Sequence, residues 1–229
     1  MVQCDLITKN ETNNPASIDL SIIPISSQKQ PFKEWKGSQK TVPDYDTWYS
    51  HYLNKGYIGI ICGLVSLNLE GLDFDLKNDP TKTIEQQFRS RIPEDLLRRL
   101  IVVKTPSGGY HYIYRCPGTK IDGNLQLAWH TDGTIIIETR GEGGYLATHV
   151  SDYQVIQGTF DVLRMTWDIP EITPQEREFL LETARSLNRN LKQTKPFSYK
   201  DPAITRFNEE FDIIPVFEKH NWSVVEEDG

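Results

Sequence analysis

One short segment carries the clearest structural signal in this sequence, and it reads Leu69-Glu70-Gly71-Leu72-Asp73-Phe74-Asp75-Leu76. Side chains alternate between the two faces of a β-strand, so a strand here places Leu72, Phe74 and Leu76 in a hydrophobic core. The same alternation puts Asp73 and Asp75 together on the opposite face. Two carboxylates one strand step apart offer hard oxygen ligands to Mg²⁺ or Mn²⁺, although the solvent-facing side of an ordinary strand gives the same pattern.

Further strands and helices are predicted on both sides of this segment. Runs rich in Ile, Val and Tyr predict strands at 57–63, 101–105, 110–115 and 134–139. Helical spacing of apolar residues predicts helices at 44–55, 83–91 and 93–100. The stretch before residue 31 predicts an irregular arm or a short strand. Strands mixed with helices, joined at least once by a hairpin, indicate an α+β fold.

The chain changes character after residue 170, where Thr173-Pro174-Gln175-Glu176 is a favourable helix start. Thr173 can cap the first turn, and Glu176 stands three residues later, as in a capping box. This helix is predicted to run to about residue 188, and a polar linker and a second helix follow. We therefore expect a main domain over 1–170 and a helical appendage over 171–229.

Composition narrows the functional classes. The 229 residues are 38% hydrophobic, and no apolar run approaches the roughly 18 residues that a membrane span needs. Cys4, Cys62 and Cys116 are too scattered for a zinc cage or a disulfide framework, and the chain start lacks a secretory signal. We therefore expect an intracellular, cytoplasmic protein without a membrane partner.

The net charge of −7 repels nucleic acid unless basic residues are concentrated locally. Such a concentration lies between Ser26 and Lys40, where four lysines face a single acid, Glu34. Nucleic-acid binding is therefore allowed, but bulk charge alone does not predict tight binding.

A second informative segment is Thr105-Pro106-Ser107-Gly108-Gly109-Tyr110-His111. Its glycines permit a tight turn with backbone N–H groups open to an anion, and the strand that follows places His111, Ile113 and Arg115 on one face. A phosphate-binding turn and an ordinary hairpin with a core histidine both agree with this pattern.

The third segment is Ile135-Ile136-Ile137-Glu138-Thr139-Arg140-Gly141-Glu142-Gly143-Gly144-Tyr145. Glu138 ends an apolar strand and shares its face with Arg140, just before a glycine-rich loop that could approach a ligand closely. Glu138 is the candidate third carboxylate. It could equally be a strand-end acid paired with Arg140.

Taken in order, the three segments resemble the Prim-Pol branch of the archaeo-eukaryotic primase superfamily, the primase-polymerase domains of phages, plasmids and related mobile replicons. The resemblance covers about residues 20–155 and rests on three motifs: Asp73-x-Asp75, Ser107-Gly108-Gly109-Tyr110-His111, and Glu138-x-Arg140-Gly141 with Gly143-Gly144-Tyr145. It implies an α+β, RRM-like antiparallel-sheet catalytic core of the primase type.

The resemblance also implies roles for individual residues. Asp73, Asp75 and Glu138 would hold two Mg²⁺ or Mn²⁺ ions, although many relatives have Asp at the third position. The residues expected to bind the incoming nucleotide are Ser107, Gly108, Gly109, His111 and Arg140. The residues expected to contact phosphate or nucleic acid are Lys33, Lys36, Lys104 and Arg115.

The implied activity is template-directed nucleotidyl transfer by a primase, a DNA polymerase or both, in the replication of a mobile element. Such an enzyme joins ribo- or deoxynucleoside triphosphates to a primer or an initiating nucleotide on a single-stranded DNA template. The segment from Arg206 to Trp222 resembles the helical piece that joins such domains to a helicase. We therefore expect a helicase region to follow in a longer protein, which would work in the host cytoplasm if a phage or plasmid encodes it.

Two other functions are considered. A nucleic-acid-binding replication module could keep the fold without the chemistry. A rolling-circle replication endonuclease would need two histidines on one strand and a nucleophilic tyrosine, and the segment His111-Tyr112-Ile113 lacks the second histidine.

Overall fold

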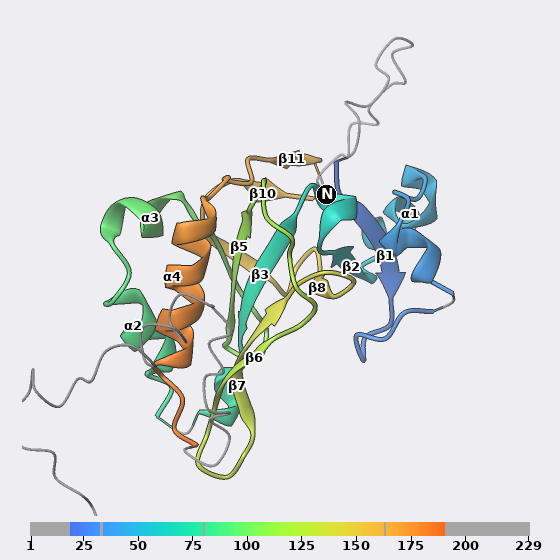
Figure 1. The fold of residues 1–229 in the computed structure, drawn as a ribbon. Helices are drawn as coiled ribbons and strands as arrows, with labels where there is room; N and C mark the ends of the chain where they lie inside the picture. Colours follow the sequence, from blue (N-terminus) through green and yellow to red (C-terminus); the bar gives the residue numbers. More distant parts are fainter. Residues whose placement is uncertain (1–18, 33, 80, 163, 191–229) are drawn as a thin grey trace, which may run out of the picture. The chain divides into compact units, whose positions relative to one another are not determined.

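A six-stranded antiparallel sheet lies at the centre of the computed structural model, which describes residues 19–32, 34–79, 81–162 and 164–190 (Figure 1). The strand order is β6-β7-β3-β5-β4-β9. The strands are β3 (Leu69–Phe74), β4 (Ile101–Lys104), β5 (Tyr110–Arg115), β6 (Gln126–Trp129), β7 (Ile135–Arg140) and β9 (Gln154–Gln157). Strand β3 has hydrogen-bonded partners on both edges, β7 and β5.

Two smaller antiparallel sheets accompany it. One has the order β1-β2-β8, with strands β1 (Ser21–Ile25), β2 (Tyr57–Ile61) and β8 (Tyr145–Thr148). The other consists of β10 (Phe160–Asp161) and β11 (Thr166–Trp167). The stretch expected to be an arm or a short strand is thus a strand, β1, paired with β2 along its length.

Short helices connect the strands. The α-helices are α1 (Tyr49–Leu53), α2 (Ile84–Arg89), α3 (Glu94–Arg99) and α4 (Pro174–Arg185). The 3₁₀ turns are η1 (Lys36–Gln39), η2 (Tyr45–Thr47), η3 (Leu64–Ser66) and η4 (Leu76–Asn78). The helix predicted over 44–55 is confirmed in part, as the short helix α1 and the turn η2, because the backbone leaves helical geometry at the fully buried Trp48.

The six-stranded sheet is covered on both faces (Figure 1). Leu72 and Phe74 belong to a hydrophobic cluster with residues of α2, α3 and α4, as the alternation along β3 predicts. Leu69, Val103 and Ile113 belong to a second cluster with residues of β1, β2 and β8. Each large apolar side chain that is fully buried in this way contributes about 1.5–3 kcal/mol.

The helix predicted after residue 170 is α4, and it begins with the predicted capping box. The Thr173 hydroxyl accepts from the Glu176 amide at 3.2 Å, and the Glu176 carboxylate accepts from the Thr173 amide at 2.8 Å. Leu180 and Leu181 pack in the first hydrophobic cluster. The compact unit that contains the sheets spans 1–191, so it includes α4, which the sequence analysis places in the appendage.

The second compact unit, 192–229, lies outside the described residues, and so does the second helix predicted for the appendage. Within the described part of the chain, none of the helices has the length and apolar character needed to cross a bilayer.

Candidate functional site

Three neighbouring strands of the six-stranded sheet bring two acids and a histidine side by side. Asp73 on β3 lies directly opposite Glu138 on β7 and directly opposite His111 on β5. Directly opposite residues of antiparallel strands point to the same face, here the face that packs on the second hydrophobic cluster. Nε2 of His111 lies 3.5 Å from Oδ1 of Asp73. We call Glu138, Asp73 and His111 the polar row.

Arg140 joins the two acids of the polar row. Its Nε and Nη2 donate to Oδ2 of Asp73 at 3.2 and 2.9 Å, and Nη2 also donates to Oε1 of Glu138 at 2.7 Å. All three side chains are largely buried, so these ion pairs are screened less than pairs on an open surface. One guanidinium therefore compensates two carboxylates that share a sheet face.

Asp75 stands just beyond the end of β3. Its amide donates to the carbonyl of Ile136 at 2.9 Å, which continues the pairing with β7 by one residue. Its carboxylate lies 2.7 Å from Nζ of Lys77, and about a third of the side chain is exposed. Asp75 therefore lies just past the end of the strand and pairs with a different cation from Asp73.

The pKa values of the two acids of the polar row are shifted in opposite directions. Burial disfavours the charged form of Asp73, but His111 and Arg140 outweigh burial, and the pKa of Asp73 lies well below its usual range. Burial raises the pKa of Glu138; Arg140 opposes the rise, and the nearby negative charge of Asp73 adds to it. Asp73 is therefore a fixed negative charge, whereas the ionised form of Glu138 is less favoured.

The turn between β4 and β5 lies over the end of β3. A Cβ atom on Gly109 would be 2.1 Å from the carbonyl oxygen of Phe74, so only glycine allows this approach. Gly108 has φ +83°, and its amide donates to the Thr105 carbonyl at 2.9 Å. That amide is used within the turn, while the exposed Ser107 hydroxyl lies 3.1 Å from Oγ1 of Thr105. The turn is therefore fixed against the strand that carries Asp73.

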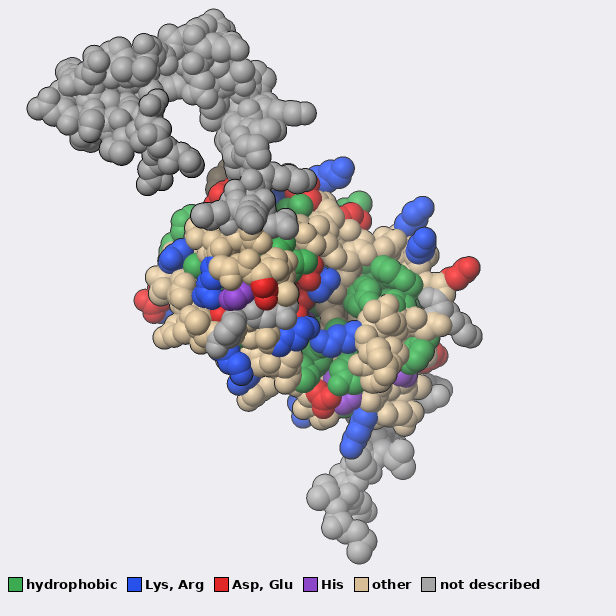
Figure 2. All heavy atoms as spheres, turned by 90° about the horizontal axis from the view of Figure 1, so that it is seen from below, with side chains coloured by type: hydrophobic (Ala, Val, Ile, Leu, Met, Phe, Trp, Pro, Cys, Tyr) green, Lys and Arg blue, Asp and Glu red, His purple; other side chains and the backbone are tan. Residues whose placement is uncertain are grey.

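The other predicted contact residues are dispersed. Lys36 on η1 and Lys104 at the end of β4 are exposed. Arg115 is nine-tenths buried and pairs with Asp19 at 2.7 Å, so the structure does not bring it to the polar row. Lys33 lies outside the described residues. Figure 2 shows Lys and Arg side chains beside Asp and Glu side chains around a hollow in the face seen from below.

The three acids, Asp73, Asp75 and Glu138, are the candidate ligands of a metal site. Among the residues that the structure describes, no three His, Cys, Asp or Glu side chains are grouped to hold a metal ion. The geometric reason is that Arg140 takes the oxygens of Asp73 and Glu138, and Lys77 pairs with Asp75. The two carboxylates nevertheless converge on one positive charge, and carboxylate oxygens are the ligands that Mg²⁺ and Mn²⁺ prefer. The donor set therefore fits a divalent cation that takes the place of the guanidinium.

Two residues near the polar row were missed by the sequence analysis. The ring of Tyr153 lies 5.8 Å from the ring of His111, and Nζ of Lys29 lies 5.8 Å from the centre of the Tyr153 ring. Both residues come from loops far apart in the sequence. Tyr153 stands in no motif or periodic pattern, whereas Lys29 is one of the four lysines between Ser26 and Lys40, a concentration that does not indicate a position near His111.

Comparison with known proteins adds one finding. The family model described as "Bifunctional DNA primase/polymerase, N-terminal" (Prim-Pol) matches residues 14–174, a span that holds the polar row, Arg140 and the turn at Gly108-Gly109. A domain of this kind indicates DNA primase or polymerase activity, with DNA and nucleotides as substrates and divalent metal ions as the typical cofactors. No curated protein matches the chain. Because the match takes in all the described strands and well over half of the 229 residues, the chain belongs to the Prim-Pol family.

Proposed function

We propose that this chain is a template-directed nucleotidyl transferase, a primase, a DNA polymerase or both, that serves the replication of a mobile element. The observation that carries the proposal is the polar row, in which Asp73 faces an acid on one neighbouring strand and a histidine on the other. We also propose that the six-stranded sheet is the RRM-like core of the primase type, since helices cover one face and the acids lie on the other.

Asp73, Asp75 and Glu138 are the residues that would hold two Mg²⁺ or Mn²⁺ ions. Such ions neutralise phosphate charge and lower the pKa of an attacking hydroxyl. The three acids come from the end of β3 and from β7, and paired strands on both edges of β3 hold their backbone in place. The protein's own contribution is therefore a rigid set of oxygen ligands.

His111 is assigned to the triphosphate of the incoming nucleotide. Its Nε2 faces Asp73 at 3.5 Å, and its strand starts directly after the turn that contains Ser107. An imidazole N–H held in this way can donate a hydrogen bond to a phosphate oxygen, and the Ser107 hydroxyl can donate a second. We therefore place the phosphates along β5 and the adjacent turn.

Arg140 is assigned to the same phosphates. A guanidinium suits bidentate contact with phosphate, and here it is held beside the acids by hydrogen bonds of 2.7–3.2 Å. Its release from the acids would leave its donors free for a nucleotide. The proposed substrates are ribo- or deoxynucleoside triphosphates with a single-stranded template and a primer or initiating nucleotide, and a helicase region is proposed in the same full-length protein.

The testing experiment is primer extension with labelled ribo- and deoxynucleotides in Mg²⁺ and in Mn²⁺. We expect incorporation that follows the template sequence, and its loss in Asp73→Asn. The matched control is Asp95→Asn, which changes an exposed acid on α3, on the helical face of the sheet. Absence of templated incorporation under all these conditions would reject the proposal.

One observation favours a second candidate, a nucleic-acid-binding replication module without catalysis. Within the described residues the acids are paired with Arg140 and Lys77, and no metal-binding group is assembled. Such a module would bind single-stranded DNA but would neither bind Mn²⁺ at the acids nor extend a primer. Mn²⁺ titration followed by electron paramagnetic resonance separates the two candidates.

A further inference from the structure

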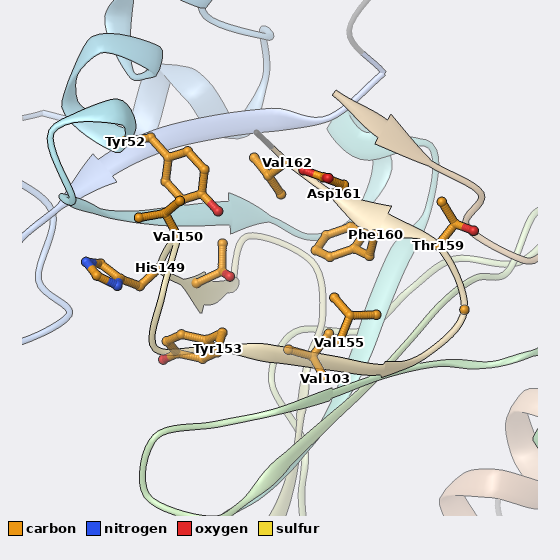
Figure 3. A pocket seen from close by; sticks show the side chains of 12 residues that line it. Tyr52, Val103, His149, Val150, Tyr153, Val155, Thr159, Phe160, Asp161 and Val162 are labelled. Carbon is orange, nitrogen blue, oxygen red and sulfur yellow. The ribbon is translucent and has the colours of Figure 1, made fainter. Parts of the chain in front are cut away.

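A cavity of about 500 Å³ lies between the two larger sheets, next to the polar row (Figure 3). Val103 of β4 and Val155 of β9 line one side, and Tyr52 of α1 lines another. The rings of Tyr153 and Phe160 complete the walls. A volume of this size is typical of sites for small organic molecules.

The hydroxyl groups of Tyr52, Thr148 and Tyr153 belong to the lining of this cavity, and the hydroxyl of Tyr153 is buried without a hydrogen-bond partner among the described residues. Tyr52 is 5% exposed and Thr148 is 8% exposed. Figure 3 shows the hydroxyl of Tyr52 directed into the cavity. Burial and the charge of Asp161 raise the pKa of Tyr52 to about 12, so the group stays a neutral donor at physiological pH. A buried polar group without a partner is costly, and a ligand with polar edges would remove that cost.

The charged groups that line the cavity already have partners. The ring of His149 lies 2.7 Å from the carbonyl of Lys55 through Nε2 and 3.2 Å from Asp152 through Nδ1. Asp161 lies 2.7 Å from Arg164. The lining therefore suits an uncharged ligand group with hydrogen-bonding edges, and the aromatic rings of its walls suit a flat one.

The cavity and the polar row occupy the same face of the six-stranded sheet. Val103 lies directly opposite His111 in the pairing of β4 with β5, so the cavity begins one strand away from the polar row. The ring of Tyr153 contacts both places, because it lines the cavity and lies 5.8 Å from the ring of His111. Adjacent strands are about 4.8 Å apart, so the two places are within the length of one nucleotide.

We propose that this cavity binds a nucleobase, taken either from a free nucleotide or from an unpaired position of a nucleic-acid strand. A nucleobase is flat and uncharged, and its edge carries hydrogen-bond donors and acceptors for Tyr52 and Thr148. The choice of ligand rests on the proposed function. The site itself is separate from the acids, and a base held there is not paired with a template base.

The first test measures binding of the four uncharged ribonucleosides to the 229-residue protein by saturation-transfer NMR and calorimetry, without divalent metal. We expect saturable binding. Tyr52→Phe removes one neutral hydrogen bond and should weaken binding about two- to tenfold. Val155→Trp should weaken it more by filling the cavity, and the partly exposed position of Val155 tolerates a larger side chain. The control is Tyr110→Phe, the same change on the helical face of the sheet.

A second arm identifies the source of the base. If the base comes from a nucleic-acid strand, Val155→Trp should weaken binding of a single-stranded oligonucleotide but leave binding of an abasic oligonucleotide unchanged. If it is a free nucleotide, nucleoside triphosphates should displace the nucleoside and the two oligonucleotides should bind alike. Either pattern supports the site. Lack of saturable nucleoside binding, or binding that both Tyr52→Phe and Val155→Trp leave unchanged in folded protein, overturns it.

Asp73→Asn separates this proposal from the proposed function. We expect this variant to bind nucleosides as the wild type does while losing nucleotide incorporation. Nucleoside binding by a protein that never extends a primer would reject the transferase and keep the cavity site. Primer extension by a protein that binds no nucleoside would keep the transferase and reject the cavity site.

Discussion

The carboxylates of Asp73 and Glu138 lie 2.9 and 2.7 Å from the same nitrogen, Nη2 of Arg140. A cation that binds these acids must compete with that guanidinium. We predict that Arg140→Gln raises the affinity of the protein alone for Mn²⁺, on the order of tenfold for a lost competing contact of about 1.4 kcal/mol. Nucleotide incorporation should fall in the same variant, because a phosphate contact is lost.

The opposite directions of these two effects make the Arg140 test specific. Mn²⁺ affinity is measured by electron paramagnetic resonance and incorporation by primer extension. Arg98→Gln is the matched control. Arg98 is exposed on α3, and within the described residues its ion pair is with Glu94. Equal Mn²⁺ affinity in wild type and Arg140→Gln would show that Arg140 does not compete with the metal.

Asp73→Ala and Asp75→Ala should each abolish nucleotide incorporation while leaving the protein folded. The apolar face of β3, formed by Leu72 and Phe74, is unchanged in both variants. Circular dichroism and thermal unfolding check the fold, and primer extension checks the chemistry. Extension close to the wild-type rate by either variant, in Mg²⁺ or Mn²⁺, would remove that residue from the metal site.

His111→Ala should weaken nucleotide binding by about ten- to a hundredfold, the value of one charge-assisted hydrogen bond of roughly 1.5–3 kcal/mol. Binding of a primer-template should change much less. Parallel titrations with nucleotide plus Mn²⁺ and with labelled DNA measure both effects. Weaker DNA binding with unchanged nucleotide affinity would move His111 from the triphosphate to the template.

Arg177→Met should destabilise the protein by about 3–5 kcal/mol, because it leaves a buried charge uncompensated. Nε and Nη2 of Arg177 donate to the Glu70 carboxylate at 2.6 and 2.9 Å, and the Tyr114 hydroxyl donates to it at 2.9 Å. Chemical denaturation measures the loss.

The double variant Glu70→Gln/Arg177→Met should recover part of the lost free energy of unfolding. A truncation before α4 should lose at least as much of this free energy as Arg177→Met does. Stability within 1 kcal/mol of the wild type, a small fraction of a usual folding free energy, would contradict a structural role for α4.

Asp79 should contribute stability that depends on pH. Its carboxylate accepts from the amides of Thr83 and Ile84 at the start of α2 at 2.9 and 3.0 Å, and from Arg189 at 2.9 Å. Although burial opposes ionisation, the hydrogen bonds from Thr81, Ile84 and Arg189 lower its pKa to about 2. The folded-state pKa is below the unfolded value, so the contribution is complete above about pH 4 and is lost as pH falls toward 2.

Asp79→Asn isolates this effect. At pH 6 the variant should be less stable than the wild type by about 1–3 kcal/mol, the usual result of weakening a buried charged acceptor. The difference should shrink between pH 4 and pH 2. Urea unfolding at each pH measures it, and a difference that is constant with pH would show that the Asp79 charge is not involved.

Local rules were sufficient to predict the central strands. The alternation of apolar and polar residues along β3 predicted that Leu72 and Phe74 enter the core, and Thr173 with Glu176 predicted the start of α4. These features depend on neighbours within a few residues. The order of the candidate motifs along the chain then predicted the family.

Long-range partners were not accessible in the same way. Arg115 shares a strand face with His111, yet its partner Asp19 is 96 residues away, and only the fold brings the two together. The packing of α4 depends on Glu70, which alternation places on the core face of β3 with Leu72 and Phe74, but its partner Arg177 is 107 residues away. The link between Arg140 and Asp73 likewise depends on the register of β7 against β3, which periodicity does not determine.

The position of β3 has a consequence for molecular motion. Its amides are hydrogen-bonded on both edges and its side chains are buried on both faces, so hydrogen–deuterium exchange at Leu72 and Phe74 should require opening of the whole sheet. Asp73 is carried on that slowly exchanging backbone. Ligands arriving at the acids then reorient side chains such as Arg140 and order no main chain, so little of their binding free energy is spent on conformational entropy.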